Sequence, residues 1–476
     1  DYREKAPLTA HKNMYLNDQG DVINNITLVG GQAAGVPGTV AGFWEAHQRF
    51  GQLPWKDLVQ PAIELADKGF VPAPILVESI HSMEQRFEGK TNFNDYFNSI
   101  SSDSLFRQPE LANTLRRIAE FGADDFYRGE TAALIVQQME KSNGLISLED
   151  LDAYAAVWRA PVRAGWRDYE IISAPPPSSG GFAIVQLLKM KDYLSELFEG
   201  VEHNSAQYIH LVAEMEKRVF ADRAEYLGDP DFFDIDIDAL IDDDYLARRA
   251  AAVNPKAISV LDSVNPGLES PNTTHYSIVD QWGNAVSNTY TINWDYGSGV
   301  VVGGAGFLLN NEMDDFSAKP GTPNIYGVVG SVANEIQPGK RMLSSMSPTI
   351  VLKGGEVEMV LGTPGGSTIF TTVFQVITNI LDFGMSVEEA IGIARFHHQL
   401  VPPDLITYSG FTIGQYLPKA TVADLLERGY RSEPHSFEYG DVQIIVRSGD
   451  SWIAASDPRD RGQSRVFEVT TKTRDR

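Results

Sequence analysis

The spacing of apolar residues predicts helices through the first half of the chain. Apolar side chains recur at intervals of three and four residues in four segments: Val40–Phe50, Trp55–Lys68, Pro109–Phe121 and Ser205–Leu227. This period is typical of amphipathic helices. A further helix, Phe182–Leu194, is predicted after the loop Ala174–Gly181, which is rich in Pro, Ser and Gly. Within Leu145–Ala153 the sequence Ser-Leu-Glu-Asp has the form of a capped helix start.

The pattern changes after residues 263–272, which are rich in Ser, Pro and Asn. Apolar and polar residues alternate over Thr273–Asp280 and Ala285–Asn293, and a three-residue hairpin loop is predicted between them. Further strands are predicted at Pro348–Lys353, Val357–Gly362, Asp441–Val446 and Trp452–Ala455, with helices at Ser367–Asp382 and from the capped start Ser386. Helices combined with hairpin strands indicate a layered α/β sandwich.

The first hairpin brings several hydroxyl groups to one end. If Asp280 pairs with Asn284, Thr273 lies opposite Thr291, and Asn293 faces the same way two residues further on. A bulge beside the loop would shift this pairing by one residue. Because threonine is in any case a good strand former, the pattern alone is weak evidence for a site.

Composition excludes several classes of function. The 476 residues include no cysteine, which rules out disulfides, zinc–thiolate and iron–sulfur sites and a cysteine nucleophile. The formal net charge is −25, so phosphate backbones and anionic lipid surfaces are repelled, and no nucleic-acid partner is expected. No apolar run approaches the roughly 18–20 residues of a membrane span.

The familiar catalytic signatures are absent. The chain has no Gly-x-Ser-x-Gly elbow and no His-Glu-x-x-His, and Gly362–Thr368 lacks the lysine of a phosphate-binding loop. His397 and His398 have no carboxylate at ligand spacing, so a structural role is favoured over metal binding. His275 shares a strand face with Thr273, and a structural role is favoured there too, since no partner that would orient it as a base is evident. We therefore predict no metal ion and no cofactor.

Longer motifs then point to a family. Thr273-Thr-His-Tyr-Ser-Ile-Val-Asp280 resembles the start of the small subunit of γ-glutamyltranspeptidases. Other motifs follow in the order and at the intervals of that family: Asp1–Glu4, Ala33–Gly38, Pro176–Gly181, Leu308–Ser317, Pro320–Gly327, Lys340–Thr349, Gly362–Ser367 and Asp457–Arg459. The resemblance covers essentially the whole chain.

This resemblance implies the N-terminal-nucleophile hydrolase fold, an α/β (α+β) protein built as a four-layer αββα sandwich. It also implies that a precursor cuts itself between Asn272 and Thr273. A large subunit, residues 1–272, and a small subunit, residues 273–476, would then stay intertwined in one globular unit. The family carries a helix-and-strand segment upstream of the Asp1–Glu4 motif, so the large subunit is expected to be N-terminally truncated in this sequence.

The implied activity is transfer of the γ-glutamyl group of glutathione and related compounds to water or to an amino-acid or peptide acceptor. Thr273 would be the nucleophile, and its freed α-amino group, with a reference pKa of about 7.7–8.0, would be the base. A single residue then supplies both groups, so no triad is needed. By resemblance, Thr291 orients Thr273, and the N–H groups of Gly365 and Gly366 stabilise the oxyanion.

The same resemblance implies how the substrate is held. Asn293, Glu312 and Asp315 match the residues that bind its α-amino group. Because Glu312 and Asp315 are three residues apart, they can face one point if the segment turns helically. The α-carboxylate binders are Arg3, Ser344 and Ser345, and Tyr326 matches the aromatic residue of a lid loop at about residues 320–331. A lid favours small γ-glutamyl substrates over polymers.

Two alternatives remain open. A relative with the same machinery could act on another amide, either a glutaryl β-lactam side chain or polyglutamate. A truncated homologue could instead be unable to mature and have no activity. The family's members are typically exported, so a periplasmic or secreted location is expected, although the sequence contains no signal region.

Overall fold

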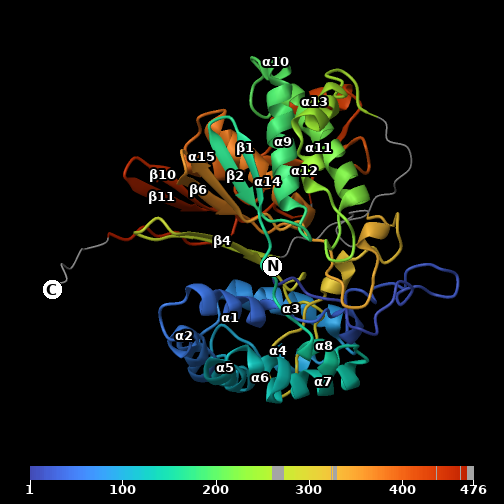
Figure 1. Cartoon of the computed structure of the whole chain (residues 1–476), viewed down its shortest axis with the longest axis vertical. Coiled ribbons are helices and arrows are strands. Elements are labelled where there is room, and N and C mark those ends of the chain that lie inside the picture. The colour runs from blue at the N-terminus through green and yellow to red at the C-terminus, as the bar shows by residue number, and fades with distance from the viewer. Residues whose placement is uncertain (260–272, 323, 325–329, 436, 461, 469–476) are drawn as a thin grey trace. The chain divides into compact units, whose positions relative to one another are not determined.

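The computed structural model describes residues 1–259, 273–322, 324, 330–435, 437–460 and 462–468 (Figure 1). The chain divides into two compact units. Unit 1 consists of Asp1–Arg159, Ile292–Lys319 and Asn334–Met342, and unit 2 of Ala160–Thr291, Pro320–Ala333 and Leu343–Arg476. Each unit therefore contains segments from both sides of the Asn272–Thr273 bond.

Unit 1 is built from helices. They are α1 (Thr39–Phe50), α2 (Trp55–Lys68), α3 (Pro74–Phe87), α4 (Phe93–Phe97), α5 (Pro109–Phe121), α6 (Ala123–Arg128), α7 (Glu130–Ser142) and α8 (Leu148–Asp152), with the 3₁₀ turns η1 (Gly31–Ala33) and η2 (Glu312–Asp315). The largest cluster of buried side chains described in this unit includes Ile135, Met139, Leu151 and Val300. Val300 comes from the second segment of the unit, so this core joins residues that are far apart in sequence.

Unit 2 contains all the described strands. An antiparallel six-stranded sheet has the order β1-β2-β5-β6-β10-β11, formed by Val162–Trp166, Tyr169–Ser173, Thr349–Lys353, Glu356–Gly362, Gln443–Ser448 and Ser451–Ser456. The hairpin is formed by β3 (Thr274–Val279) and β4 (Ala285–Tyr290), and a third sheet by β7 (Arg395–His397), β8 (Leu405–Ser409) and β9 (Arg431–Pro434).

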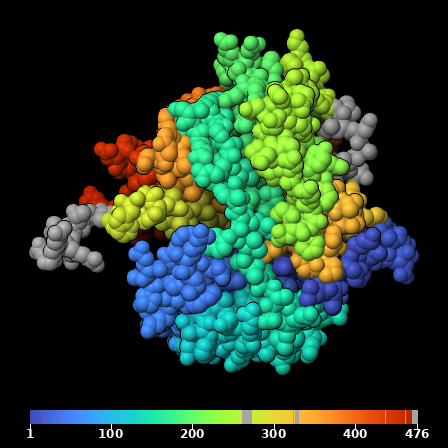
Figure 2. Space-filling model, in the orientation of Figure 1, coloured from blue at the N-terminus to red at the C-terminus, as the bar shows by residue number. Residues whose placement is uncertain are grey.

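The helices of unit 2 begin with α9 (Gly180–Tyr193), α10 (Ser195–Phe198), α11 (Ala206–Tyr226), α12 (Ile237–Leu240) and α13 (Asp243–Ala251). The turn η4 (Gly366–Thr368) leads into α14 (Ile369–Leu381), and α15 (Val387–Gly392) and α16 (Lys419–Glu427) follow; the 3₁₀ turn η3 spans Val332–Asn334. In the space-filling view, the green segment that contains α9 and α11 forms much of the visible surface of this unit (Figure 2). None of the described helices is both long and apolar enough to cross a membrane.

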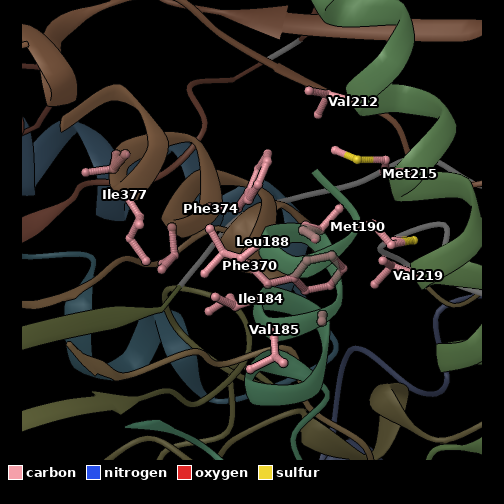
Figure 3. Close-up of a cluster of buried hydrophobic side chains, with 14 of the residues drawn as sticks. Ile184, Val185, Leu188, Met190, Val212, Met215, Val219, Phe370, Phe374 and Ile377 are labelled. Carbon is pink, nitrogen blue, oxygen red and sulfur yellow. The ribbon is translucent and has the colours of Figure 1, made fainter. Parts of the chain in front are cut away.

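One face of the six-stranded sheet carries the main core. Helices α9 and α14 contact its strands, and α11 packs against α9. Their side chains point toward one another in Figure 3, where Ile184 and Leu188 of α9 meet Phe370 and Phe374 of α14. Met359 and Leu361 of β6 belong to this core, so the alternating position Gly362 faces the other side of the sheet.

The hairpin packs on that other side. Both of its strands contact β6, and β3 also contacts β10. A Cβ atom added at Gly362 would lie only 2.3 Å from the His275 ring. The imidazole therefore occupies the space that a side chain at position 362 would need. Helices on one face of the sheet and a hairpin on the other give unit 2 its αββ layering.

The predicted register of the hairpin is confirmed. The N–H of Asp280 donates to the Asn284 carbonyl at 3.0 Å, and Gly283 in the loop has a φ of 84°. Thr274 pairs with Tyr290 and His275 with Thr289, so no bulge shifts the pairing. The strand itself begins one residue later than predicted, at Thr274.

The contact between His275 and Gly362 generates a prediction about stability. Gly362→Ala places a methyl group against the imidazole, and such overpacking lowers the free energy of unfolding by about 1–3 kcal/mol. Gly165→Ala in β1 is the matched control, because its new Cβ has no heavy atom within 4 Å. Urea unfolding of the two variants checks this; equal midpoints would contradict the proposed packing.

Candidate active site

The candidate site residues fall into two groups, one in each unit. Unit 1 holds Arg3, Asn293, Glu312 and Asp315, and unit 2 holds Thr273, Thr291, Ser344, Ser345, Gly365 and Gly366. Asn272 and Tyr326 lie outside the described residues.

Arg3 is the centre of the unit 1 group. Its Nη1 lies 2.7 Å from Glu312 Oε2, and its Nη2 pairs with Asp315. As predicted, the three-residue spacing on a helical turn, here η2, brings both carboxylates to one point. Nε of Arg3 donates to the Met342 carbonyl at 3.3 Å, and Glu4 approaches Nη1 at 3.6 Å. One guanidinium is thus shared among three acidic side chains.

Burial shifts the pKa values of the groups in this cluster. Glu312 is fully buried, and burial raises its pKa well above the ordinary value, although Arg3 opposes the rise. Burial likewise raises the pKa of Glu4 to about 7, again against the effect of Arg3. Burial alone would lower the pKa of Arg3, but Glu312, Asp315 and Glu4 outweigh it and raise that pKa. With more acidic groups than cations, the cluster is suited to accept a second cation.

Asn293 is tied to the same segment. Its Nδ2 donates to the Asn311 carbonyl at 2.9 Å, and Asn311 Oδ1 accepts from the Trp294 N–H at 3.0 Å. Asn311 directly precedes Glu312. Asn293 is buried and has a φ of 71°, a left-handed conformation that asparagine tolerates better than most residues.

In unit 2, the hairpin presents Thr273 and Thr291. Continuing its register by one residue places Thr273 opposite Thr291. Closer to the hairpin loop than these two threonines, His275 Nδ1 lies 2.8 Å from Thr289 Oγ1, and His275 Nε2 lies 3.1 Å from Ser277 Oγ. Burial lowers the pKa of His275 to about 3, so the ring is neutral at neutral pH. Both ring nitrogens are engaged by hydroxyls, which supports the structural role favoured from the sequence.

Contacts with the sheet show which end of β6 these threonines lie near. Ser287 Oγ donates to the Leu361 carbonyl at 3.1 Å, and His275, paired with Thr289, meets Gly362. Residues further along β4, from 287 to 289, therefore lie against residues further along β6. The next residues in that direction are Thr291 on the hairpin and the loop from Thr363 to Gly366 after β6.

Gly365 lies in the loop after β6, and Gly366 is the first residue of η4. Their φ values are 138° and 56°, conformations that favour glycine. In the part of the chain that the structure describes, neither N–H donates to a protein acceptor. Two adjacent N–H groups without a protein acceptor, just ahead of a helix, form an arrangement that suits a developing negative charge.

Ser344 and Ser345 are held by a neighbouring turn. The Ser344 carbonyl accepts from the N–H and the Oγ–H of Ser179, both at 2.8 Å. Ser344 Oγ accepts from the Met346 N–H at 3.1 Å, and Ser345 Oγ accepts from Arg223 Nη2 at 3.2 Å. A hydroxyl has one hydrogen to donate, and among the described residues neither hydroxyl donates it to a protein acceptor. Both hydrogens are therefore available to an anionic ligand.

Arg223 is a functional candidate that the sequence reasoning missed. It is buried in α11, and its Nε also donates to Ser179 Oγ at 3.0 Å. The one available signal was a charged residue within the helix predicted at Ser205–Leu227. Its partner Ser345 is 122 positions away, so local patterns could not connect the two.

Other titratable groups serve the core. His397 lies in β7, with Nδ1 3.0 Å from Thr371 Oγ1 and Nε2 3.1 Å from Gln399 Oε1. Burial lowers the pKa of His397 and of His398 to about 3. Within the described ranges, no group of three or more His, Asp or Glu side chains is placed to hold a metal ion.

Comparison with solved structures first defines the class. The chain superposes on cephalosporin acylase from Bacillus halodurans with a TM-score of 0.82 at 23% identity, over 99% of this chain and 84% of that chain. A likeness at this identity shows the fold alone. The N-terminal-nucleophile hydrolase fold expected from the sequence is thereby confirmed.

The family follows from sequence comparison. The family model described as Gamma-glutamyltranspeptidase matches residues 1–467. Glutathione hydrolase proenzyme from Pseudomonas aeruginosa is 56% identical over 470 residues, which are 98% of this chain and 84% of the relative. The protein of the same name from Escherichia coli K12 is 42% identical over 469 residues, which are 96% of this chain and 79% of the relative. This chain belongs to the γ-glutamyltranspeptidase family, which is a family of enzymes. A γ-glutamyltranspeptidase structure from Pseudomonas nitroreducens, complexed with L-DON, matches with a TM-score of 0.53 at 54% identity, over 55% of this chain and 78% of that chain.

The unit 1 cluster generates a prediction about stability. Arg3→Gln removes the guanidinium and leaves buried Glu312 and partly buried Asp315 without it, which lowers the free energy of unfolding by about 3–5 kcal/mol at pH 7.5. The loss shrinks at pH 5, because protonated carboxyls no longer repel one another. Urea unfolding at the two pH values measures both effects.

Arg128→Gln is the matched control for this prediction. Arg128 also pairs with two acids, Asp124 and Asp152, but on the exposed surface. Exposed pairs contribute less than about 1 kcal/mol. Equal losses in the two variants would show that the Arg3 cluster is not an internal ionic site.

Proposed function

We propose that this protein is a self-processing γ-glutamyl transferase and hydrolase. It cleaves the γ-glutamyl amide of glutathione and related small compounds and passes the acyl group to water or to an amino-acid or peptide acceptor. The observation that carries the proposal is the unit 1 cluster, in which one guanidinium and an excess of carboxyl groups complement a zwitterionic α-amino-acid end. Membership of the γ-glutamyltranspeptidase family supports the same substrate class.

Self-processing cuts the bond between Asn272 and Thr273, giving a large subunit of residues 1–272 and a small subunit of residues 273–476. The Thr273 hydroxyl attacks the preceding carbonyl, and water opens the resulting ester. The six-stranded sheet supports lasting association of the pieces, since β2 of the first pairs with β5 of the second over five residue pairs. The relatives named proenzymes fit this scheme.

In the mature enzyme, the α-amino group of Thr273 takes the proton from the Thr273 hydroxyl as the oxygen attacks the γ-carbonyl carbon. The oxyanion is stabilised by the N–H groups of Gly365 and Gly366, of which one is typically worth about 10²–10³ in rate. The intermediate collapses, the C–N bond breaks, and the leaving amine takes the proton from the ammonium of Thr273. Water or an acceptor amine then attacks the γ-glutamyl ester, with the same amino group as base. Thr291 orients Thr273 throughout.

The substrate's α-ammonium is bound by Glu312 and Asp315 with Asn293, and its α-carboxylate by Arg3 and the Ser344 and Ser345 hydroxyls. Arg3 is already paired with Glu312 and Asp315, so binding exchanges an internal ion pair for two ion pairs with the ligand. The family resemblance assigns Tyr326 to a lid loop at about residues 320–331, and such a lid would favour small donors. No cofactor takes part.

We also propose that the protein works in the periplasm or as a secreted protein. This proposed location rests on the typical export of the family's members.

A second candidate is an acylase for glutaryl β-lactams. Acylase ACY 1 proenzyme from Pseudomonas sp. strain SE83 is 33% identical over 462 residues. A glutaryl group lacks the α-ammonium and would leave Glu312 and Asp315 without a ligand cation, so the carboxyl-rich cluster favours the γ-glutamyl substrate. A homologue that never matures is the remaining outcome of the tests below.

The nucleophile is tested by Thr273→Ala. The variant should lose both self-cleavage and turnover, because the hydroxyl that attacks in both steps is gone. The wild type should give two bands of about 30 and 22 kDa on a denaturing gel, the size of compact units, and release chromophore from a γ-glutamyl anilide. Thr274→Ala, one residue along and exposed, is the control that should mature and turn over. A cut Thr273→Ala chain would overturn the assignment.

Substrate class is tested by comparing γ-glutamyl and glutaryl anilides. Each lost charge-assisted hydrogen bond costs about 1.5–3 kcal/mol. The glutaryl compound would lose two, to Glu312 and Asp315, so its kcat/KM should be lower by about 10²–10⁴-fold. Asp315→Asn should reduce γ-glutamyl turnover and narrow this ratio. Equal use of the two anilides by the wild type would favour the acylase.

A further inference from the structure

The loop that carries Gly365 and Gly366 is held by two threonine hydroxyls. Thr363 Oγ1 donates to the Pro364 carbonyl at 2.8 Å. Thr368 donates twice to the Gly365 carbonyl, from its N–H at 3.0 Å and from Oγ1 at 2.8 Å. Both threonines are buried, so water does not compete for these bonds.

These bonds fix peptide groups, and not only carbonyls. A peptide group is planar and trans, so its N–H points away from its C=O. Holding the Pro364 carbonyl therefore aims the Gly365 N–H, and holding the Gly365 carbonyl aims the Gly366 N–H. Each glycine N–H is thus oriented by one threonine.

Neighbouring atoms restrict the positions of these two hydroxyls. Thr363 Oγ1 accepts from the Asp441 N–H at 2.9 Å, and a Cβ atom at Gly440 would lie 2.2 Å from it. A Cβ atom at Gly365 would lie 2.6 Å from Thr368 Oγ1. The glycines at 365 and 440 thus make room for the two hydroxyls as well as for unusual backbone angles.

We infer that Thr363 and Thr368 are positioning residues that aim the Gly365 and Gly366 N–H groups at the tetrahedral oxyanion, an inference that rests on the proposed γ-glutamyl transfer. Each hydroxyl donates its hydrogen to a carbonyl of the loop. Each acts only through the peptide group it holds. Misaimed donors weaken binding of the transition state and leave ground-state binding unchanged.

The test uses Thr363→Val and Thr368→Val in the full chain. In each, kcat for a γ-glutamyl anilide should fall about 10–10²-fold, part of the effect of losing a donor outright, while KM changes less than about twofold. Affinity for a boronic-acid analogue of the γ-glutamyl group, whose boron becomes a tetrahedral anion on Thr273, should fall in parallel. Affinity for glutamate, which forms no oxyanion, should stay the same.

Two kinds of control separate an effect on the orientation of the glycine N–H groups from an effect on the stability of the fold. Thr363→Ser and Thr368→Ser keep the hydroxyl and should recover kcat to within about threefold of the wild type. Thr378→Val removes a hydroxyl bonded to the Phe374 carbonyl at 3.0 Å inside α14. It should lower thermal stability without altering kcat or boronate affinity.

Other outcomes overturn the inference. Valine variants with wild-type kcat and boronate affinity would refute it while the proposed function stood. If they do not mature, the alanine variants are measured in the same way; failure of these as well, with Thr378→Val maturing, would assign the threonines to folding and refute the inference. A wild type that neither cuts the anilide nor binds the boronate would refute the proposed function itself, and this inference with it.

Discussion

Packing of the β3–β4 hairpin on β6 is the constraint on which the rest of unit 2 depends. His275 fits against Gly362 because position 362 has no side chain, and the bonds from Ser287 to Leu361 and from Ser277 to Gln443 fix the hairpin along the sheet. Burial keeps the imidazole neutral, so no charge is trapped between the layers. A one-residue slip would turn Thr273 and Thr291 away from the sheet. The same contact therefore sets the hairpin's height above the sheet and decides that its threonines lie toward the Thr363–Gly366 loop.

The two groups of candidate residues, one in each unit, meet the same requirement in different ways. Buried polar groups must be satisfied by the protein, yet a binding site must keep some capacity for its ligand. Unit 1 keeps an excess of carboxyl groups around Arg3, so an added cation lowers the electrostatic energy. Unit 2 keeps donors: the Gly365 and Gly366 N–H groups and the hydroxyl hydrogens of Ser344 and Ser345. The proposed substrate, an α-amino acid that carries a γ-acyl group, has both a cation and anionic oxygens.

Sequence reasoning succeeded where the determining forces are local. Helices α2 and α5 were predicted to the residue, because each combines apolar periodicity with a clear boundary, Pro109 at the start of α5 or Gly69 after α2. The hairpin register followed from its own loop. Strands β1 and β2 were missed, since β2 pairs with β5, about 180 residues away, and β1 joins the sheet only through β2. Strand β7 is buried on both faces, so its sequence shows no alternation of apolar and polar residues. Helix α14 starts two residues later than predicted, because the 3₁₀ turn η4 precedes it. Arg223 needs the tertiary fold to meet Ser345, so no local pattern marks it. The site roles themselves came from resemblance and stay predictions, and the structure adds contacts of Arg3, Ser344 and Ser345.

The interleaving of the sheet bears on why a nucleophile of this kind is compatible with a stable fold. Strands β1 and β2 precede the proposed cut, while β5, β6, β10 and β11 follow it. Cutting between Asn272 and Thr273 would thus break no sheet hydrogen bond, since β3 begins only at Thr274 and is held to β4 and to the sheet on its own account. The new α-amino group would appear on a residue whose neighbours are already fixed by His275 and the hairpin register. Its position would then depend on packing that exists before the cut, so the precursor can assemble the site first and complete it by one bond cleavage.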